Sequence, residues 1–346
     1  MSRSLPGLLP DELEELVVSL GQPAYRGRQI FEWIHRHGVL DPSEMTNLPV
    51  PLRERLAVTR AEEVRRLTSS DGLTSKLLLR LYDGQEIESV EMRTIDGRKT
   101  ICVSSQAGCA MGCVFCVTGQ FGFARNLDAG EIVEQVLRFS TPARPVTNVV
   151  FMGMGEPLAN YDETVLAIRL LTHPDGLHLG ARRITVSTAG VVPAMRRLAT
   201  ERLQVGLAIS LHSPRDVLRS ELMPINRRWP IEEVLAAADD YVERTGRRVS
   251  YEYTLMSGVN DTDALADDLA ALLHGRLAHV NLIPLNPTED ASLVAPSANR
   301  ALAFERRLRQ AGIAATIRVN RGRDILAACG QLRLAEKRKA PVPVVV

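Results

Sequence analysis

The sequence predicts an α/β protein whose main domain is a partial (β/α)6 barrel, with a small N-terminal helical domain and a short β-meander extension. Three observations support this fold class. Short apolar runs alternate with amphipathic segments after residue 100, Asp-Gly pairs separate extended runs just before it, and the first 65 residues show helical apolar periodicity. Strand–helix alternation implies parallel strands joined by right-handed crossovers, and repeated units of this kind favour a full or partial barrel.

Three helices make up the predicted N-terminal domain, residues 1–65. The first spans 8–21, with an apolar face formed by Leu13, Leu16, Val17 and Leu20. The second follows Pro23, with Ile30 and Ile34 on one side, and a third short helix lies around 52–57. Basic side chains on the second helix indicate either a solvated basic face or an RNA-contacting element: Arg26, Arg28, His35, Arg36 and His37.

The extension, residues 66–98, is predicted to be a hairpin and meander of about three strands. Asp83-Gly84 stands between two extended runs, and Asp-Gly in that position is a strong hairpin signal. A second pair, Asp96-Gly97, leads into the first strand of the barrel and so brings Cys102 just ahead of a cysteine-rich loop.

The barrel is predicted over residues 99–335, followed by a disordered tail at 336–346. Its candidate strands are 100–105, 148–153, 183–188, 206–212, 249–255, 280–285 and 315–319. In such barrels the chemistry lies at the carboxyl ends of the strands. Residues that could line a site for a polar small molecule stand at these ends: Gly155, Glu156, Ser187, Ser210, Leu211, His212 and Asn286. His212 is either a base or a buried core histidine.

Cys109, Cys113 and Cys116 form a C-x3-C-x2-C pattern in the loop after the first barrel strand. Apolar core positions on a helix, a disulfide framework and a zinc site are the alternatives to an iron–sulfur cluster. Repeated glycines favour a loop over a helix, the five cysteines are an odd number, and zinc usually takes four protein ligands. The pattern therefore favours a cluster, with three ligands that leave one iron free.

Two further cysteines and one glutamate have both a structural and a chemical interpretation. Cys329 could be a buried structural thiol or, together with Cys102, could form and break a disulfide during turnover. Glu88, one strand before Cys102, is either an exposed strand residue or a general base.

Composition narrows the class of protein. The chain has 346 residues, 45% apolar residues and a net charge of +1, so any nucleic-acid site must be a local patch. No apolar run suits a signal segment or a membrane span. We therefore expect a monomeric cytoplasmic protein whose thiols stay reduced.

Taken together, the motifs resemble one known family. The run CVSSQAGCAMGCVFCVTGQFGFARNL, within residues 100–130, is similar to the signature of the radical-SAM RNA adenine methyltransferases, the RlmN/Cfr family. The resemblance extends through PAYRGRQIFEWI, MTNLP, VVFMGMGEPL, ITVSTAGVVP, LAISLHSP, VNLIPLNP and AACGQL, in order along nearly the whole chain.

The resemblance implies a role for each candidate residue. Cys109, Cys113 and Cys116 would ligate a [4Fe-4S] cluster whose free iron binds S-adenosylmethionine, held by the residues at the strand ends. Cys329 would carry a methyl group from one cofactor molecule, and a second would give the 5′-deoxyadenosyl radical that activates it. Glu88 would accept the ring proton of adenine, and Cys102 would resolve the covalent protein–RNA intermediate.

The implied substrate is C2 of an adenine in 23S rRNA, with tRNA as a further candidate, and the implied partner is a flavodoxin- or ferredoxin-type electron donor. Methylation at C8 of the same base is the alternative within the family. A non-catalytic iron–sulfur RNA-binding protein is the alternative from another class, although such a protein would need neither Cys102 nor Cys329.

Overall fold

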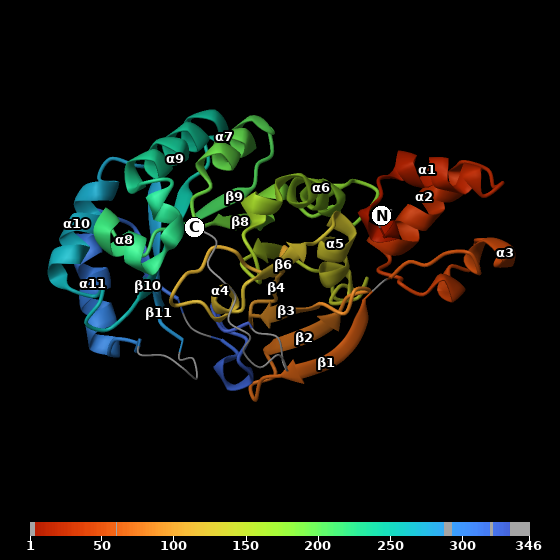
Figure 1. Cartoon of the computed structure of the whole chain (residues 1–346). Helices are drawn as coiled ribbons and strands as arrows, with labels where there is room; N and C mark the ends of the chain where they lie inside the picture. Colours follow the sequence, from red (N-terminus) through yellow and green to blue (C-terminus); the bar gives the residue numbers. More distant parts are fainter. Residues whose placement is uncertain (1–3, 60, 287–292, 319–320, 333–346) are drawn as a thin grey trace.

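A ten-stranded sheet forms the centre of the molecule, with strands in the order β1-β2-β3-β4-β7-β8-β9-β10-β11-β12 (Figure 1). The computed structural model describes residues 4–59, 61–286, 293–318 and 321–332. Neighbouring strands are antiparallel from β1 to β4 and parallel from β4 to β12. This arrangement confirms the predicted α/β fold.

The parallel strands overlap all seven predicted apolar runs. They are β4 (Lys99–Cys102), β7 (Asn148–Phe151), β8 (Ile184–Thr188), β9 (Gly206–Ser210), β10 (Val249–Leu255), β11 (Ala278–Pro284) and β12 (Ala315–Ile317). The helices that connect them lie along the outer side of the curved sheet (Figure 1). These are α5 (Ala129–Leu137), α6 (Tyr161–Thr172), α7 (Val192–Thr200), α8 (Asp216–Leu222), α9 (Ile231–Thr245), α10 (Asp263–Leu273) and α11 (Ala298–Gln310).

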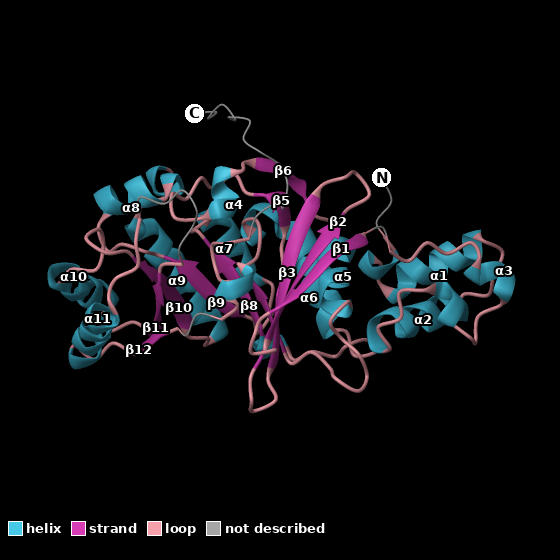
Figure 2. Ribbon diagram, turned by 90° about the horizontal axis from the view of Figure 1, so that it is seen from below, coloured by secondary structure: helices cyan, strands magenta, loops and turns pink. Residues whose placement is uncertain are grey.

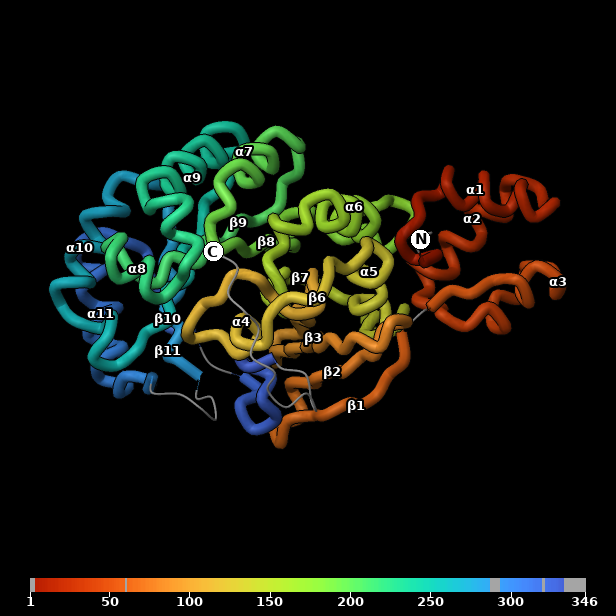
Figure 3. The backbone as a smooth tube through the Cα atoms, viewed as in Figure 1, coloured from red at the N-terminus to blue at the C-terminus, as the bar shows by residue number. Residues whose placement is uncertain are grey.

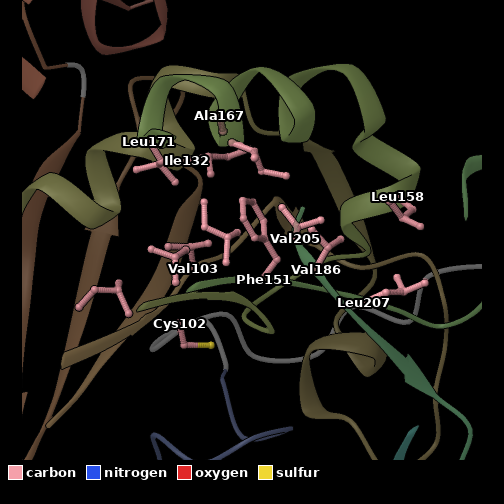
Figure 4. Close-up of a cluster of buried hydrophobic side chains, with 14 of the residues drawn as sticks. Cys102, Val103, Ile132, Phe151, Leu158, Ala167, Leu171, Val186, Val205 and Leu207 are labelled. Atoms are coloured by element: carbon pink, nitrogen blue, oxygen red, sulfur yellow. The ribbon is translucent and has the colours of Figure 1, made fainter. Parts of the chain in front are cut away.

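Alternation along the strands gives the sheet an apolar face toward the helices and a second face on the opposite side. Val103, Phe151 and Val186 pack toward Ile132 of α5 and Leu171 of α6 in an apolar layer (Figure 4). Cys102 projects away from these helices, on the other side of the sheet (Figure 4). Burial of the apolar layer drives the helices onto the sheet and so fixes the strand ends that carry the polar residues.

The N-terminal helices form a group of their own at one end of the molecule (Figure 2). They comprise α1 (Pro10–Ser19), α2 (Tyr25–Phe31) with a π-helical turn at Glu32–Arg36, and α3 (Val50–Arg53). The helices α1 and α2 match the prediction, whereas α3 is shorter than the helix predicted around 52–57 and begins earlier. Pro49 and Pro51 explain this, because proline suits the start of a helix.

One member of the predicted basic face belongs to the core instead. His35 is fully buried and stacks on Phe31, with ring centroids 4.2 Å apart. Its neighbours Arg36 and His37 lie on the turn outside this contact, and Arg36 is exposed. The interpretation of His35 as a surface residue was therefore wrong, because a π-helical turn at this point rotates it inward.

The extension consists of β1 (Glu62–Thr68), β2 (Thr74–Arg80) and β3 (Glu86–Arg93), and it continues the barrel sheet without a break. The proposed boundary at residue 65 falls within β1. A small second sheet, β5 (Gln106–Gly108) with β6 (Phe123–Asn126), brackets the cysteine loop and α4 (Val117–Gln120). The predicted tail, 336–346, lies outside the described residues. In the part of the chain that is described, no helix is long and apolar enough to cross a membrane.

Candidate functional site

A cavity opens at the carboxyl ends of the parallel strands and collects most of the predicted site residues. Its lining includes Cys109, Cys113, Cys116, Gly155, Glu156, Ser187, Ser210, His212, Asn286 and Cys329. These residues come from the ends of four strands, the cysteine loop and the C-terminal segment. Parallel strands bring their carboxyl ends to one edge, which explains how positions so far apart in sequence meet.

The cysteine loop is held at both ends by backbone hydrogen bonds. Cys109 N–H donates to Gly122 O at 2.8 Å, and Val117 N–H donates to Gly330 O at 2.9 Å. Gly108 has φ of +80°, and a Cβ there would lie 2.1 Å from Gly122 O. Only glycine fits this close backbone approach, so the loop before the first cysteine depends on it.

The three cysteine thiols lie in a desolvated environment. Burial raises the pKa of Cys109 to about 12 and also raises the pKa values of Cys113 and Cys116. Thiols of this kind stay protonated until a metal replaces the proton. A cluster of positively charged irons supplies that compensation, so the donor set fits the group.

A [4Fe-4S] cluster and a single metal ion make different demands on the positions of their donors. Across the described residues, no three His, Cys, Asp or Glu side chains are grouped tightly enough to hold a single metal ion. The thiolates of a [4Fe-4S] cluster each bind a different iron, so their sulfurs need not converge on one point.

Glu156 organises the rim of the cavity. Its carboxylate accepts hydrogen bonds from the backbone N–H of Leu158 at 3.0 Å and of Ala189 at 2.7 Å. Burial nonetheless raises its pKa to about 7. The loop that carries Glu156 passes close to the end of β4, because Gly153 and Gly155 have no side chain. A Cβ on Gly153 would lie 2.6 Å from Val103 O.

His212 packs against the cysteine loop, and its ring does not act as a base near neutral pH. Its Nδ1 accepts a hydrogen bond from Thr254 N–H at 2.8 Å, and Phe115 packs edge-on against its ring. Burial lowers its pKa to about 3, so the ring is neutral. Leu211 does not line the cavity: its side chain is fully buried, and its backbone N–H donates to Glu252 O.

Asn286 connects the rim to the C-terminal segment. Its Nδ2 donates to Cys329 O at 3.0 Å. Its Oδ1 is buried, lines the cavity and has no hydrogen-bond partner among the described residues. A buried amide oxygen of this kind points to a ligand donor, such as an amino group.

Cys102 and Cys329 share the charge of one arginine. Burial raises the pKa of the Cys102 thiol to about 12, and the guanidinium of Arg318 opposes that rise. The nearby Cys329 sulfur in turn raises the pKa of Arg318. The structure thus gathers the two non-cluster thiols around a buried cation, in contrast to the interpretation of Cys329 as an isolated structural thiol.

Two site residues escaped the sequence analysis. Glu252 lines the cavity, accepts from Asn281 Nδ2 at 2.9 Å through Oε1, and has a buried Oε2 without a partner among the described residues. Arg318 stands just after β12. Both residues could have been suspected from the sequence, because a charged residue inside or directly after an apolar strand run must face a polar site.

Glu88 lies outside the main cavity. Val90 pairs with Cys102, so Glu88, two residues away, projects to the same face of the sheet as Cys102. Its carboxylate forms an ion pair with Lys76 at 2.9 Å and faces a second cavity beside the turn at Arg323–Ile325. Glu88 is therefore a buried residue and not the exposed one of the alternative interpretation.

Comparisons with known proteins agree along the whole chain. A model of the radical SAM superfamily matches residues 103–269, and one of the ribosomal RNA large subunit methyltransferase N-terminal domain matches 4–61. A curated "Probable dual-specificity RNA methyltransferase RlmN" from Frankia alni is 54% identical, covering 96% of this chain and 83% of that protein. A protein of the same description from Moorella thermoacetica is 50% identical and covers 96% and 98%.

A solved structure matches the fold equally well. The crystal structure of a radical SAM methyltransferase from Sphaerobacter thermophilus has a TM-score of 0.94 and 53% identity, and it covers 96% of this chain and 99% of that one. Membership of the superfamily implies a [4Fe-4S] cluster and S-adenosylmethionine, which the three clustered cysteines fit. The chain belongs to the RlmN family of radical SAM RNA methyltransferases.

Proposed function

We propose that this enzyme methylates C2 of an adenine in 23S rRNA, and also in tRNA, through an S-methylcysteine at Cys329. The observation that supports this most directly is the common cavity of Cys109, Cys113, Cys116 and Cys329, with Cys102 next to Cys329 across Arg318. A methyl carrier must reach both the cofactor site and the resolving thiol. The names of the curated relatives supply the RNA class.

The cofactors supply the one-electron chemistry: hydrogen abstraction from the methyl group, and uptake of one electron from the RNA adduct. The side chains of the protein carry out the remaining steps. Bound S-adenosylmethionine would supply an electrophilic methyl group, and Cys329, once its thiol proton has passed to solvent, would provide the sulfur that takes it up. Asn286 holds the backbone of Cys329 at the rim of the cavity.

Product release needs two further residues. Glu88 accepts the ring proton from C2 of the adduct, and the Cys102 thiolate then attacks the sulfur of Cys329. The S–S bond forms as the S–CH2 bond breaks, and the carbon takes up a proton to become the methyl group of the product. An external dithiol reduces the disulfide, and a flavodoxin- or ferredoxin-type protein supplies the electrons for the cofactor.

Mass spectrometry of nucleosides tests this proposal. Purified, cluster-loaded enzyme is incubated with 23S rRNA or tRNA from a strain that lacks the gene, and the digested RNA is analysed. We expect 2-methyladenosine from both RNAs. Exclusive formation of 8-methyladenosine would assign the alternative regiochemistry, and absence of product from tRNA would restrict the substrate to rRNA.

A further inference from the structure

Lys76 connects the strand of Glu88 to the segment of Cys329. Its Nζ lies 2.9 Å from Glu88 Oε1 and donates to Leu326 O at 3.1 Å. Both side chains of the ion pair are nearly inaccessible, at 8% and 4% exposure. The C-terminal segment (dark blue) passes beside β2 and β3 in Figure 3. The ammonium group of Lys76, on β2, therefore contacts both Glu88 of β3 and the C-terminal segment.

The segment before Cys329 depends on such contacts. Leu326 adopts φ of +51°, a left-handed conformation that costs an L-residue free energy and persists only when its surroundings hold it. Asp324 accepts a hydrogen bond from Ser70 N–H at 2.8 Å, and Arg321 donates to Arg93 O at 2.7 Å. Lys76 adds a contact at Leu326, shortly before Cys329, to the one that Asn286 makes at Cys329 itself.

We propose that Lys76 is a positioning residue for methyl transfer, which keeps the Glu88 carboxylate ionised and holds the Cys329 segment against the extension. This inference rests on the proposed function for the part that concerns Glu88. The proton from C2 of the adduct moves to a Glu88 oxygen, while the accompanying electron leaves by the cofactor chemistry described above. A Glu88 side chain that is already protonated cannot accept that proton.

The surroundings of Glu88 explain why it needs this cation. Lys76 faces it from β2 and Arg65 from β1, whereas Asp324 faces the same cavity from the turn and Cys102 lies on the same face of β4. A buried carboxyl group favours its neutral form unless a nearby positive charge offsets desolvation. Lys76 is the buried cation of this set, because Arg65 is exposed.

A second buried pair provides a matched control. Lys99 lies 3.0 Å from Glu91 Oε1, both side chains are 11% exposed, and Lys99 Nζ also donates to Arg144 O. Glu91 alternates with Val90 along β3, so this pair occupies the opposite face of the same sheet. Lys99→Met therefore reproduces the loss of a buried lysine without touching the site.

The experiment compares Lys76→Met, Lys76→Gln and Lys99→Met. The first readout is the pH profile of single-turnover methylation by the loaded enzyme. Because loss of a close opposite charge typically shifts a carboxyl pKa by roughly one to three units, the acid limb of both Lys76 variants should move that far to higher pH. Lys99→Met should keep the wild-type profile.

The second readout does not need activity. Alkylation of Cys329 in cluster-free protein, followed by mass spectrometry, should be several-fold faster in Lys76→Met, and unchanged in Lys99→Met. Lys76→Gln should stay close to wild type here, since an amide can still donate to Leu326 O, and it carries the pH test if Lys76→Met does not fold.

Wild-type pH profiles in both Lys76 variants, together with wild-type alkylation in Lys76→Met, would overturn the inference. A Glu88→Gln enzyme that methylates normally would instead refute the proposed role of Glu88. In that case the alkylation result still decides whether Lys76 positions the carrier segment.

Discussion

The two cysteines outside the C-x3-C-x2-C motif, Cys102 and Cys329, differ in their surroundings. Cys102 is buried at 6% exposure on β4, and its pKa of about 12 leaves almost no thiolate at neutral pH. Cys329 is more accessible and lines the cofactor cavity. The guanidinium of Arg318 opposes the rise in the Cys102 pKa, so it favours the thiolate of that residue.

Replacement of Cys102 tests the resolving role directly. Cys102→Ala should bind a full cluster and transfer the carbon to RNA, but it should accumulate a covalent protein–RNA adduct because nothing opens the S–C bond. The adduct would run as a nuclease-sensitive slow band on a denaturing gel. Cys113→Ala, which lacks a cluster ligand, should give no such band. Free release of methylated RNA by Cys102→Ala would refute the assignment.

For single residues, the sequence predicted which residues form the site better than which of their side chains contact one another. Cysteine spacing and strand-end positions identified the cavity because local sequence and strand direction determine both. The partner of Glu88 could not be predicted, since Lys76 lies on a neighbouring strand and only the register Leu78–Glu88 and Lys76–Val90 brings the two together. Arg318 and Glu252 could be suspected from their charge in apolar strand runs, but only the curvature of the strands brings both to the cavity.

Among the elements, the cysteine loop has the strictest backbone requirement. Gly108 combines a positive φ with a backbone contact that no Cβ could tolerate, whereas Gly97 has φ of +86° with nothing near its Cβ position. Both would suffer the strain of a left-handed alanine, of order 1 kcal/mol or more. The clash is specific to Gly108, and it would displace the β5–β6 hairpin that places Cys109.

This difference predicts unequal effects of two alanine substitutions. Gly108→Ala should lower the iron content of anaerobically reconstituted enzyme to a small fraction of wild type, which colorimetric iron analysis measures. Gly97→Ala should lose only thermal stability and keep about four irons per chain. Equal iron content in the two variants would show that the close approach of the hairpin is not needed for cluster assembly.

Element boundaries show where local sequence information ends. The seven parallel strands were predictable because short apolar runs with flanking turns depend little on context. The π-helical turn at Glu32–Arg36 was not, because packing against the rest of the domain sets it. That same turn buries His35, a residue that charge patterning alone assigned to the surface.

On the scale of the whole molecule, His35 lies where the N-terminal domain meets the barrel. Phe31 stacks on it and contacts His173, which follows α6, at a centroid distance of 4.7 Å. Neither ring nitrogen of His35 has a hydrogen-bond partner among the described residues. Burial lowers the pKa of His35 to about 3, with His173 adding to the shift.

The sign of the resulting pH effect follows from linkage. Below the unfolded pKa of about 6.5, the unfolded chain binds a proton that the folded His35 excludes, so stability falls as the pH decreases from 6.5 toward 3. Between pH 7 and pH 5 this amounts to about 2 kcal/mol for one histidine. His212, also held neutral by burial, contributes in the same direction from inside the barrel.

Replacing His35 by phenylalanine should therefore flatten the acid side of the stability curve. Phenylalanine keeps the stack on Phe31 and cannot take up a proton, so His35→Phe should lose about 2 kcal/mol less than wild type between pH 7 and pH 5. Urea unfolding of the cluster-free chain at both pH values measures the difference. His37→Phe, on the same turn but outside the buried stack, serves as the control and should follow wild type. If His35→Phe lost as much stability as wild type, protonation of His35 would not be what loosens the contact between the two domains in acid. The carboxylates of the barrel would then carry the effect, and the attachment of the N-terminal domain would not depend on the charge of this ring.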